Sequence, residues 1–339
     1  MTKHSTLFLT SRGERHQQAA IAAAPRDLDI TLRRDPSREE ILRLLPQMEF
    51  LISERSGVID AEMIASARNL KLIQRLGAQT WDIDLDAARR SGIAVCYLPI
   101  ATCQLVAEHM ILQILALVKH LGEVTQIALE AGDWGTPQRC TEDYFADNWS
   151  RRKNIHGLRQ STVGILGFGE IGLELAQRLC AFDCTVLYTK RHRLPSSAEA
   201  DLKITYATQN ELLTQSDFIC SLLPLFPETE QTLNADFFAA MKRGAIFAHC
   251  GAGAVVDENA LLAALRSKHL AGAALDTYTY EPLRPDDPLL SVARDPLQNL
   301  ILTPHIGSGT LASDNTHRTS DYTNIMALLA GKPLRYQLA

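Results

Sequence analysis

A chain of 339 residues is longer than one ordinary domain, and at about 150 residues per domain it predicts two. Hydrophobic residues make up 46% and charged residues 22%, which excludes a wholly disordered, collagen-like or low-complexity protein. The formal net charge of −5 argues against a nucleic-acid partner. The most apolar segment, residues 110–118, is shorter than the roughly 20 residues of a bilayer span, so we expect no membrane partner.

The first hundred residues alternate short apolar runs with helical patterns. The runs that predict strands are residues 5–10, 28–32, 50–53, 72–75 and 93–97, and the helical patterns are residues 38–45 and 61–67. This alternation predicts a parallel sheet covered by helices on both faces. A long apolar helix from Thr102 to Leu121 should follow and end near Gly122.

Residues 132–160 interrupt the alternation with an irregular segment. It contains Trp134, Pro137, Trp149 and a basic stretch at residues 150–153. No regular period runs through it. We expect either a connection or an arm that contacts another subunit.

A second alternating series begins at Ser161. Its expected strands are residues 162–166, 185–188, 218–222, 245–248, 272–275 and 300–303, and its expected helices are residues 170–180, 210–213, 235–241 and 258–267. A final helix is expected at residues 319–329. The series opens on a glycine-rich turn, which is the doubly wound arrangement that binds nucleotides.

The strongest motif is G-x-G-x-x-G at Gly167, Gly169 and Gly172. An apolar strand precedes it and an amphipathic helix follows it, as a dinucleotide fingerprint requires. Gly167 allows the tight turn, Gly169 lets backbone N–H groups approach a pyrophosphate, and Gly172 lets helix and strand pack closely. The helix begins with Glu170 and Ile171, so their N–H groups should face the diphosphate.

The next strand should end with the residue that reads the adenosine ribose. An enzyme specific for NAD places an acid there, but no Asp or Glu occurs between Cys184 and Ala198. After Thr189 stand Lys190, Arg191 and Arg193 instead. Of these, Lys190 and Arg191 would bind a 2′-phosphate, so NADP is favoured and NAD remains possible.

Seven cysteines are present, an odd number with no CxxC pair. Cys180 and Cys184 are four apart, without a second cluster to complete a zinc site. We therefore expect no metal, and buried reduced thiols in a cytoplasmic protein.

Further motifs stand along the chain in a fixed order. They are the segments 76–84 (LGAQTWDID), 106–109 (VAEH), 223–229 (LPLFPET), 256–258 (VDE), 275–282 (LDTYTYEP) and 303–308 (TPHIGS). Together with the glycine fingerprint they resemble the D-isomer-specific 2-hydroxyacid dehydrogenase family over almost the whole length. The stretch Tyr188 to Arg191 resembles the glyoxylate/hydroxypyruvate reductase branch, which uses NADPH.

The resemblance implies two doubly wound parallel-sheet α/β domains with a cleft between them. The flavodoxin-like substrate domain would comprise residues 1–117 and 309–339, and the Rossmann-type cofactor domain residues 118–308. It also implies a homodimer built by the cofactor domains, with segment 132–160 as the embracing arm.

The resemblance further assigns roles to individual residues. His305 would exchange a proton with the substrate oxygen, and Glu281 would hold that histidine. Val106 would pack on the nicotinamide, and backbone N–H groups of Gly77, Ala78 and Gln79 would meet the substrate carboxylate. The remaining cofactor contacts would come from Thr189, Pro224, Cys250, Gly251, Asp276, His305 and Gly307.

The chain departs from the family at one catalytic position. The family reads Arg-Gly-x-x-Val-Asp where this chain has Ala252-Gly253-Ala254-Val255-Val256-Asp257. Ala252 can neither hold a substrate carboxylate nor polarise a carbonyl. Three explanations are open: an inactivating substitution, a different substrate anchor such as Arg75 or a residue of the arm, or a lineage that kept cofactor binding and lost catalysis.

The leading function is hydride transfer between a nicotinamide cofactor and a small anionic 2-keto or 2-hydroxy acid. One alternative is a cofactor-binding protein without turnover, which Ala252 favours and the retained His305 and Glu281 oppose. Another is a phosphite-type oxyanion dehydrogenase, because the stretch 283–299 is long, as in that branch of the family.

Overall fold

The computed structural model describes residues 3–55, 57–130, 132–309 and 318–339. The chain forms two compact units, one of residues 1–102 with 310–339 and one of residues 103–309. The start of the returning segment, residues 310–317, was expected in the substrate domain and lies outside the described residues.

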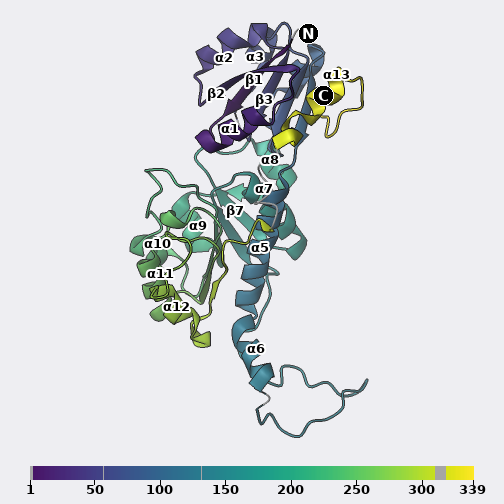
Figure 1. The fold of residues 1–339 in the computed structure, drawn as a ribbon. Coiled ribbons are helices and arrows are strands. Elements are labelled where there is room, and N and C mark those ends of the chain that lie inside the picture. The colour runs from purple at the N-terminus through teal and green to yellow at the C-terminus, as the bar shows by residue number, and fades with distance from the viewer. Residues whose placement is uncertain (1–2, 56, 131, 310–317) are drawn as a thin grey trace. The chain divides into compact units, whose positions relative to one another are not determined.

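The first unit is built on a parallel sheet with the strand order β2-β1-β3-β4-β5 among the described residues (Figure 1). The order reverses between β1 and β3, which is the flavodoxin-like form of the doubly wound fold. Its elements are β1 (His4–Thr10), α1 (Glu14–Ala22), β2 (Leu28–Arg34), α2 (Arg38–Leu44), β3 (Phe50–Glu54), α3 (Ala61–Ser66), β4 (Leu72–Leu76), α4 (Leu85–Arg90) and β5 (Ala94–Leu98).

The C-terminal residues complete this first unit. A 3₁₀ turn, Arg318–Tyr322, leads into α13 (Thr323–Leu329), and Tyr322 and Ile325 are fully buried against the sheet. The last residues run beside β5, where the N–H of Val95 donates to the oxygen of Ala339 at 3.0 Å and that of Leu338 to Val95 at 2.8 Å. The tail therefore covers the edge strand that would otherwise be open.

The second unit holds a larger parallel sheet, ordered β12-β11-β10-β9-β6-β7-β8 in the described chain. The order reverses at β6, so the carboxyl ends of β6, β7 and β9 meet at a nucleotide-binding switch point. The prediction of two doubly wound parallel-sheet α/β domains is confirmed. The strands are β6 (Thr162–Leu166), β7 (Thr185–Thr189), β8 (Ile204–Tyr206), β9 (Phe218–Ser221), β10 (Ile246–His249), β11 (Gly272–Leu275) and β12 (Leu300–Leu302).

Helices cover this sheet and bury its apolar side chains. Strands β9, β10 and β11 are buried along their whole length, as expected for a parallel sheet with two covered faces. On one face Phe237, Phe238 and Phe247 pack edge to face. The helices are α7 (Glu170–Leu179), α8 (Ser196–Leu202), α9 (Gln209–Gln215), α10 (Ala235–Ala240), α11 (Glu258–Arg266) and α12 (Pro288–Ala293).

The long apolar helix differs from the sequence prediction at its C-terminal end. Helix α5 (Ala101–Val118) stops before Gly122, and a second helix, α6 (Leu121–Glu130), contains that glycine. His120 adopts a left-handed conformation with φ of +49° between the two helices. The break therefore comes from His120, and the glycine that we expected to end the helix lies inside the next one.

By length and composition α5 could cross a membrane, and it is the one helix of the described chain that could. Half of its residues are buried inside the protein, among them the polar Gln113. A core helix of a globular unit meets the same criteria, and this burial favours that interpretation.

Residues 132–160 contain no helix and no strand of the sheet, as expected. They form an open loop beyond α6 (Figure 1). Trp134 and Trp149 contact each other with ring centroids 5.5 Å apart, yet they remain 40% and 43% exposed, and Phe145 is 67% exposed. Several large apolar side chains therefore remain accessible in this segment.

Candidate active site and dinucleotide site

The glycine turn after β6 has the conformation that a dinucleotide site needs. Gly167 has φ of +92°, and a Cβ there would lie 3.1 Å from the backbone of Leu222. A Cβ on Gly172 would lie 3.2 Å from the oxygen of Gly167, so helix and turn pack closely and a side chain there would be tight. A Cβ on Gly169 would have no heavy atom within 4 Å, so the open side of the turn lies there.

Helix α7 begins directly after this turn. Gly169 is its N-cap residue and makes no side-chain cap hydrogen bond. Glu170 and Ile171 form the first turn of the helix, where backbone N–H groups and the helix dipole attract anions. Open space over Gly169 and an N-terminus without a side-chain cap together fit a diphosphate.

The structure separates the three cations that follow β7. Arg193 donates to Glu199 through hydrogen bonds of 2.8 and 2.7 Å, and this pairing holds the pKa of Glu199 below its ordinary value. Arg191 is exposed, with its guanidinium carbon 5.3 Å from the ring centroid of Phe226. Arg193, which was not assigned to the phosphate, is therefore neutralised by an internal carboxylate. Lys190 and Arg191 remain beside Thr189.

His305 and Glu281 meet at the carboxyl ends of the neighbouring strands β11 and β12. The Nδ1 atom of His305 lies 2.7 Å from Oε2 of Glu281, and Oε1 of that carboxylate accepts the N–H of Tyr278 at 3.0 Å. The Nε2 atom has no hydrogen-bond partner among the described residues, and the His305 side chain is 56% exposed. A histidine held in this way can present one proton at Nε2 to a ligand.

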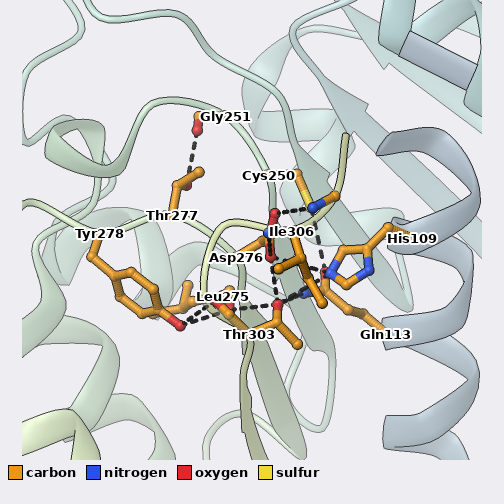
Figure 2. A network of polar contacts seen from close by, with 11 residues as sticks. His109, Gln113, Cys250, Gly251, Leu275, Asp276, Thr277, Tyr278, Thr303 and Ile306 are labelled. Carbon is orange, nitrogen blue, oxygen red and sulfur yellow. Dashed lines mark hydrogen bonds and ion pairs between the residues drawn. The ribbon is translucent and has the colours of Figure 1, made fainter. Parts of the chain in front are cut away.

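The carboxylate of Asp276 is the centre of a buried polar network (Figure 2). Its Oδ1 accepts from the Thr303 hydroxyl at 2.6 Å and the Ile306 N–H at 3.0 Å, and its Oδ2 accepts from the Gly307 N–H at 2.8 Å. His109 Nε2 lies 3.3 Å from Oδ1. Burial alone would raise the pKa of Asp276, but these hydrogen bonds outweigh burial and hold the pKa below its ordinary value.

Helix α5 contributes two side chains to the same network, and Figure 2 shows both pointing toward the strand ends. His109 Nε2 lies 3.1 Å from Thr303 Oγ1, and Gln113 Nε2 donates to the same oxygen at 3.2 Å. Cys250 donates its thiol to Gln113 Oε1 at 3.4 Å. Burial raises the pKa of Cys250, so its thiol stays protonated.

The turn after β10 places Ala252 close to the backbone of neighbouring loops. A Cβ on Gly251 would lie 2.6 Å from the oxygen of Leu223, and one on Gly253 would lie 1.9 Å from that of Tyr278. Both positions therefore exclude a side chain. Ala252 itself is half-buried, and its N–H donates to Leu223 at 2.9 Å.

His249 lies at the end of β10 and supports this turn. Its ring is fully buried, with Nε2 3.2 Å from the oxygen of Ala252. Burial lowers the pKa of His249 to about 4, so the ring is neutral at pH 7 and donates from Nε2. The sequence analysis did not single out this residue.

The expected substrate loop belongs to the first unit and follows β4. Gly77 has φ of +132°, Gly77 and Gln79 are buried, and Ala78 is half-buried. Arg75, suggested as a substitute anchor, is fully buried. It donates to Asp82 at 2.9 Å and to the oxygen of Gly57 at 2.9 Å. Arg75 is therefore not available to a substrate.

The seven cysteines all lie in the described residues and are free thiols. Cys96, Cys103, Cys220 and Cys250 are buried, as expected, but Cys180 and Cys184 are only half-buried and Cys140 is exposed, so the expectation of burial was wrong for these three. In the part of the chain that the structure describes, no group of three His, Cys, Asp or Glu side chains could hold a metal ion.

Sequence analysis assigned no role to Thr303, Gln113 or Tyr278, although all three complete the network. Tyr278 donates its hydroxyl to the oxygen of Thr303 at 2.8 Å. A signal was present for α5, because His109 and Gln113 are polar residues four apart in the more apolar C-terminal part of the helix. Beside the His305–Glu281 pair lies a cavity of about 520 Å³ lined by Tyr278, Glu281, Pro282, Leu283, Leu290, Leu302, Thr303, Pro304 and His305.

Comparisons with known proteins agree on one family. Residues 111–307 match the model of the D-isomer specific 2-hydroxyacid dehydrogenase, NAD binding domain. Glyoxylate/hydroxypyruvate reductase B of Yersinia pestis (strain Pestoides F) is 32% identical over 296 residues, which are 87% of this chain and 85% of that protein.

Solved structures give the same result. The TT0316 protein of Thermus thermophilus is 29% identical with a TM-score of 0.52, covering 99% of this chain and 100% of that one. A glyoxylate reductase of Paecilomyes thermophila is 26% identical with a TM-score of 0.52, covering 100% and 99%. A formate dehydrogenase of Granulicella M. is 29% identical with a TM-score of 0.54, covering 92% and 80%.

The buried neutral His249 predicts a pH-dependent stability. Because its folded pKa of about 4 is below the unfolded value of 6.5, the unfolded state binds more protons between these values. The free energy of unfolding is therefore not reduced by His249 above pH 6.5, and it falls as the pH drops from 6.5 toward 4. Replacing His249→Gln should therefore reduce the loss of unfolding free energy between pH 7 and 4.5 by about 2 kcal/mol. Urea unfolding at both pH values measures this, and identical pH slopes in both proteins would contradict it.

Proposed function

This chain belongs to the D-isomer specific 2-hydroxyacid dehydrogenase family, and from that premise we propose that it transfers hydride between NADP(H) and a small 2-keto or 2-hydroxy acid. The observation that carries the proposal is the His305–Glu281 pair at the carboxyl edge of the sheet that bears the glycine turn. The relative from Yersinia pestis is named for glyoxylate and hydroxypyruvate, and acids of that size are our first candidates.

The cofactor would lie along the carboxyl edge of the second sheet. The open turn over Gly169 and the N-terminus of α7 would hold its diphosphate. Further along the edge, Asp276 would accept the nicotinamide carboxamide through Oδ2, which the network leaves with a single hydrogen bond. Pro224, Cys250, Gly251 and Gly307 would line the groove between these two ends.

His305 would act as the acid in reduction and the base in oxidation. The bound cofactor supplies the hydride in reduction, and His305 then gives its Nε2 proton to the carbonyl oxygen of the substrate. Glu281 fixes the tautomer by accepting from Nδ1 at 2.7 Å. The N–H groups of Gly77, Ala78 and Gln79 would bind the substrate carboxylate.

Preference for NADP follows from the loop after β7. An acid at the end of this strand would accept from a ribose hydroxyl, and Lys190 and Arg191 stand there in its place. The carboxylate that follows in the sequence, Glu199, is bound by Arg193. No acid stands between Cys184 and Ala198 to replace these cations at the strand end.

Replacing Lys190→Ala and Arg191→Ala together should weaken NADPH binding by about tenfold or more, because a charge-assisted contact contributes about 1.5–3 kcal/mol. NADH binding should change little. Fluorescence titration of both reduced cofactors measures this. Tighter NADH than NADPH binding in the parent protein would contradict the preference, and so would an unchanged NADPH affinity in the double variant.

Because Ala252 cannot anchor a substrate, we expect this chain to turn over its substrate slowly. By the motif resemblance, Ala252 occupies the position of the family's arginine, and Arg75 is fully buried elsewhere, so we expect no replacement from Arg75. A cofactor-binding protein with little catalysis is therefore a second candidate. The stretch 283–299, on which the oxyanion hypothesis rests, contains α12, whose Leu289 and Val292 are buried in the core.

Replacing Ala252→Arg should raise kcat/KM for 2-keto acids by roughly 10²-fold, corresponding to about 3 kcal/mol of transition-state contact. Cofactor affinity should stay unchanged. The measurement is steady-state reduction of a panel of 2-keto acids by NADPH, with phosphite oxidation as a further arm. A parent enzyme that is already fast, and no gain in the variant, would show that another group anchors the substrate.

We also propose a homodimer that works in the cytoplasm. Segment 132–160 exposes Trp134, Phe145 and Trp149, which a second copy would cover, and free thiols suit a reducing compartment. Sedimentation velocity at micromolar concentration should show a dimer, and Trp134→Ser/Trp149→Ser should weaken it. If the parent protein sediments as a monomer, the proposed homodimer is wrong. If the native protein is recovered in an exported fraction, the proposed cytoplasmic location is wrong.

A further inference from the structure

Two loops flank the glycine turn on either side. Strand β6 lies between β7 and β9, so the loop after β7 and the loop after β9 lie on opposite sides of the turn after β6. The first loop carries Arg191, and the second carries Phe226. The Arg191–Phe226 contact at 5.3 Å therefore joins the two loops beside the place proposed for the adenosine end of the cofactor.

The loop that carries Phe226 is held by its own hydrogen bonds. The N–H of Phe226 donates to Thr229 Oγ1 at 2.8 Å, and that hydroxyl donates to the oxygen of Pro224 at 2.7 Å. The N–H groups of Thr229 and Glu230 donate to the oxygen of Phe226 at 3.0 and 3.1 Å. These hydrogen bonds restrain the backbone of Phe226. Its ring is 43% exposed and can be contacted by a neighbouring side chain.

The loop that carries Arg191 is anchored just beyond it. Arg193 and Tyr188 both donate to Glu199, and the N–H of Leu194 donates to the hydroxyl of Tyr188 at 2.9 Å. These contacts fix the loop backbone and leave the Arg191 side chain exposed. The guanidinium carbon of Arg191 lies over the Phe226 ring, 5.3 Å from its centroid, in a cation–π contact.

This cation–π contact has a specific consequence for anion recognition. A guanidinium held over an aromatic ring keeps the N–H donors that point away from the ring available for a phosphate. The contact also restricts a long side chain that would otherwise lose rotamer freedom when it binds. Phe226 should therefore favour binding of the 2′-phosphate without touching it.

We infer that Phe226 is a positioning residue for cofactor selectivity, which holds Arg191 ready for the 2′-phosphate of NADP. The inference rests on the proposed preference for NADP and adds a residue to it from a different loop. It predicts that Phe226 matters for ligands with a 2′-phosphate and hardly at all for ligands without one.

The test compares adenosine 2′,5′-bisphosphate with AMP by titration calorimetry on the full chain, so that the substrate end takes no part. Phe226→Leu keeps an apolar side chain but removes the ring, and it should weaken bisphosphate binding about three- to fivefold. AMP binding should stay unchanged. Phe226→Tyr should retain the parent affinity, and Leu225→Ala, at the exposed neighbouring position, is the matched control that should change neither ligand.

A double-mutant cycle separates positioning from general loop damage. In an Arg191→Ala background, Phe226→Leu should cause no further loss, because no guanidinium remains to be held. Equal losses for both ligands, no loss for the bisphosphate, or a full loss in the Arg191→Ala background would each overturn the inference. Parallel titrations of the parent with NADPH and NADH test the proposed function itself, which fails if NADH binds as tightly.

Discussion

The buried carboxylate of Asp276 is the interaction on which the site depends. It receives hydrogen bonds from Thr303, Ile306 and Gly307, so the segment after β12 is tied to the end of β11. His305 lies within that segment and adopts a left-handed backbone with φ of +52°, which is unfavourable for a side chain. The Asp276 hydrogen bonds on either side of it hold this conformation in place.

The same carboxylate explains why polar residues occur inside an apolar helix. An ionised group buried among strand ends is costly unless donors surround it. His109 and Gln113 on α5 supply or support such donors through Thr303. One turn of α5 is thereby joined to the strand ends that carry the proton-transfer pair. The packing of α5 and the strand ends that carry the His305–Glu281 pair thus depend on the same hydrogen-bond network within the second unit.

Much of the fold could be predicted from the sequence, because its signals are local. The apolar run 162–166 followed by three spaced glycines predicted β6, the turn and α7 with correct bounds at β6. Helices α1, α4, α6, α8 and α12 and strand β8 were not predicted. α1 buries only Ala20 and α6 buries no residue, so neither has the buried apolar stripe that identifies a helix. The end of α5 was misplaced because a left-handed His120, which no pattern announces, makes the break.

Residues of the candidate site could be predicted where they belong to a motif. They could not be predicted where their availability depends on a hydrogen-bond partner elsewhere in the fold. The pairing of His305 with Glu281 could be expected from two motifs, although they lie 24 residues apart. Arg193 is unavailable to a ligand because it donates to Glu199. Arg75 is unavailable because it donates to Asp82 and to the oxygen of Gly57. Neither contact leaves a periodic trace in the sequence. His249 was not predicted to be special because its low pKa is caused mainly by burial, which no motif in the sequence indicates.

The central claim is that the His305–Glu281 pair moves the substrate proton while the glycine turn holds the cofactor. The most direct measurement compares His305→Gln with the parent in two assays, NADPH binding and single-turnover reduction of glyoxylate. Our account predicts a reduction rate lower by about 10²-fold or more, as expected when a general acid is lost, with a much smaller change in the NADPH dissociation constant. Unchanged turnover in the variant would contradict the account.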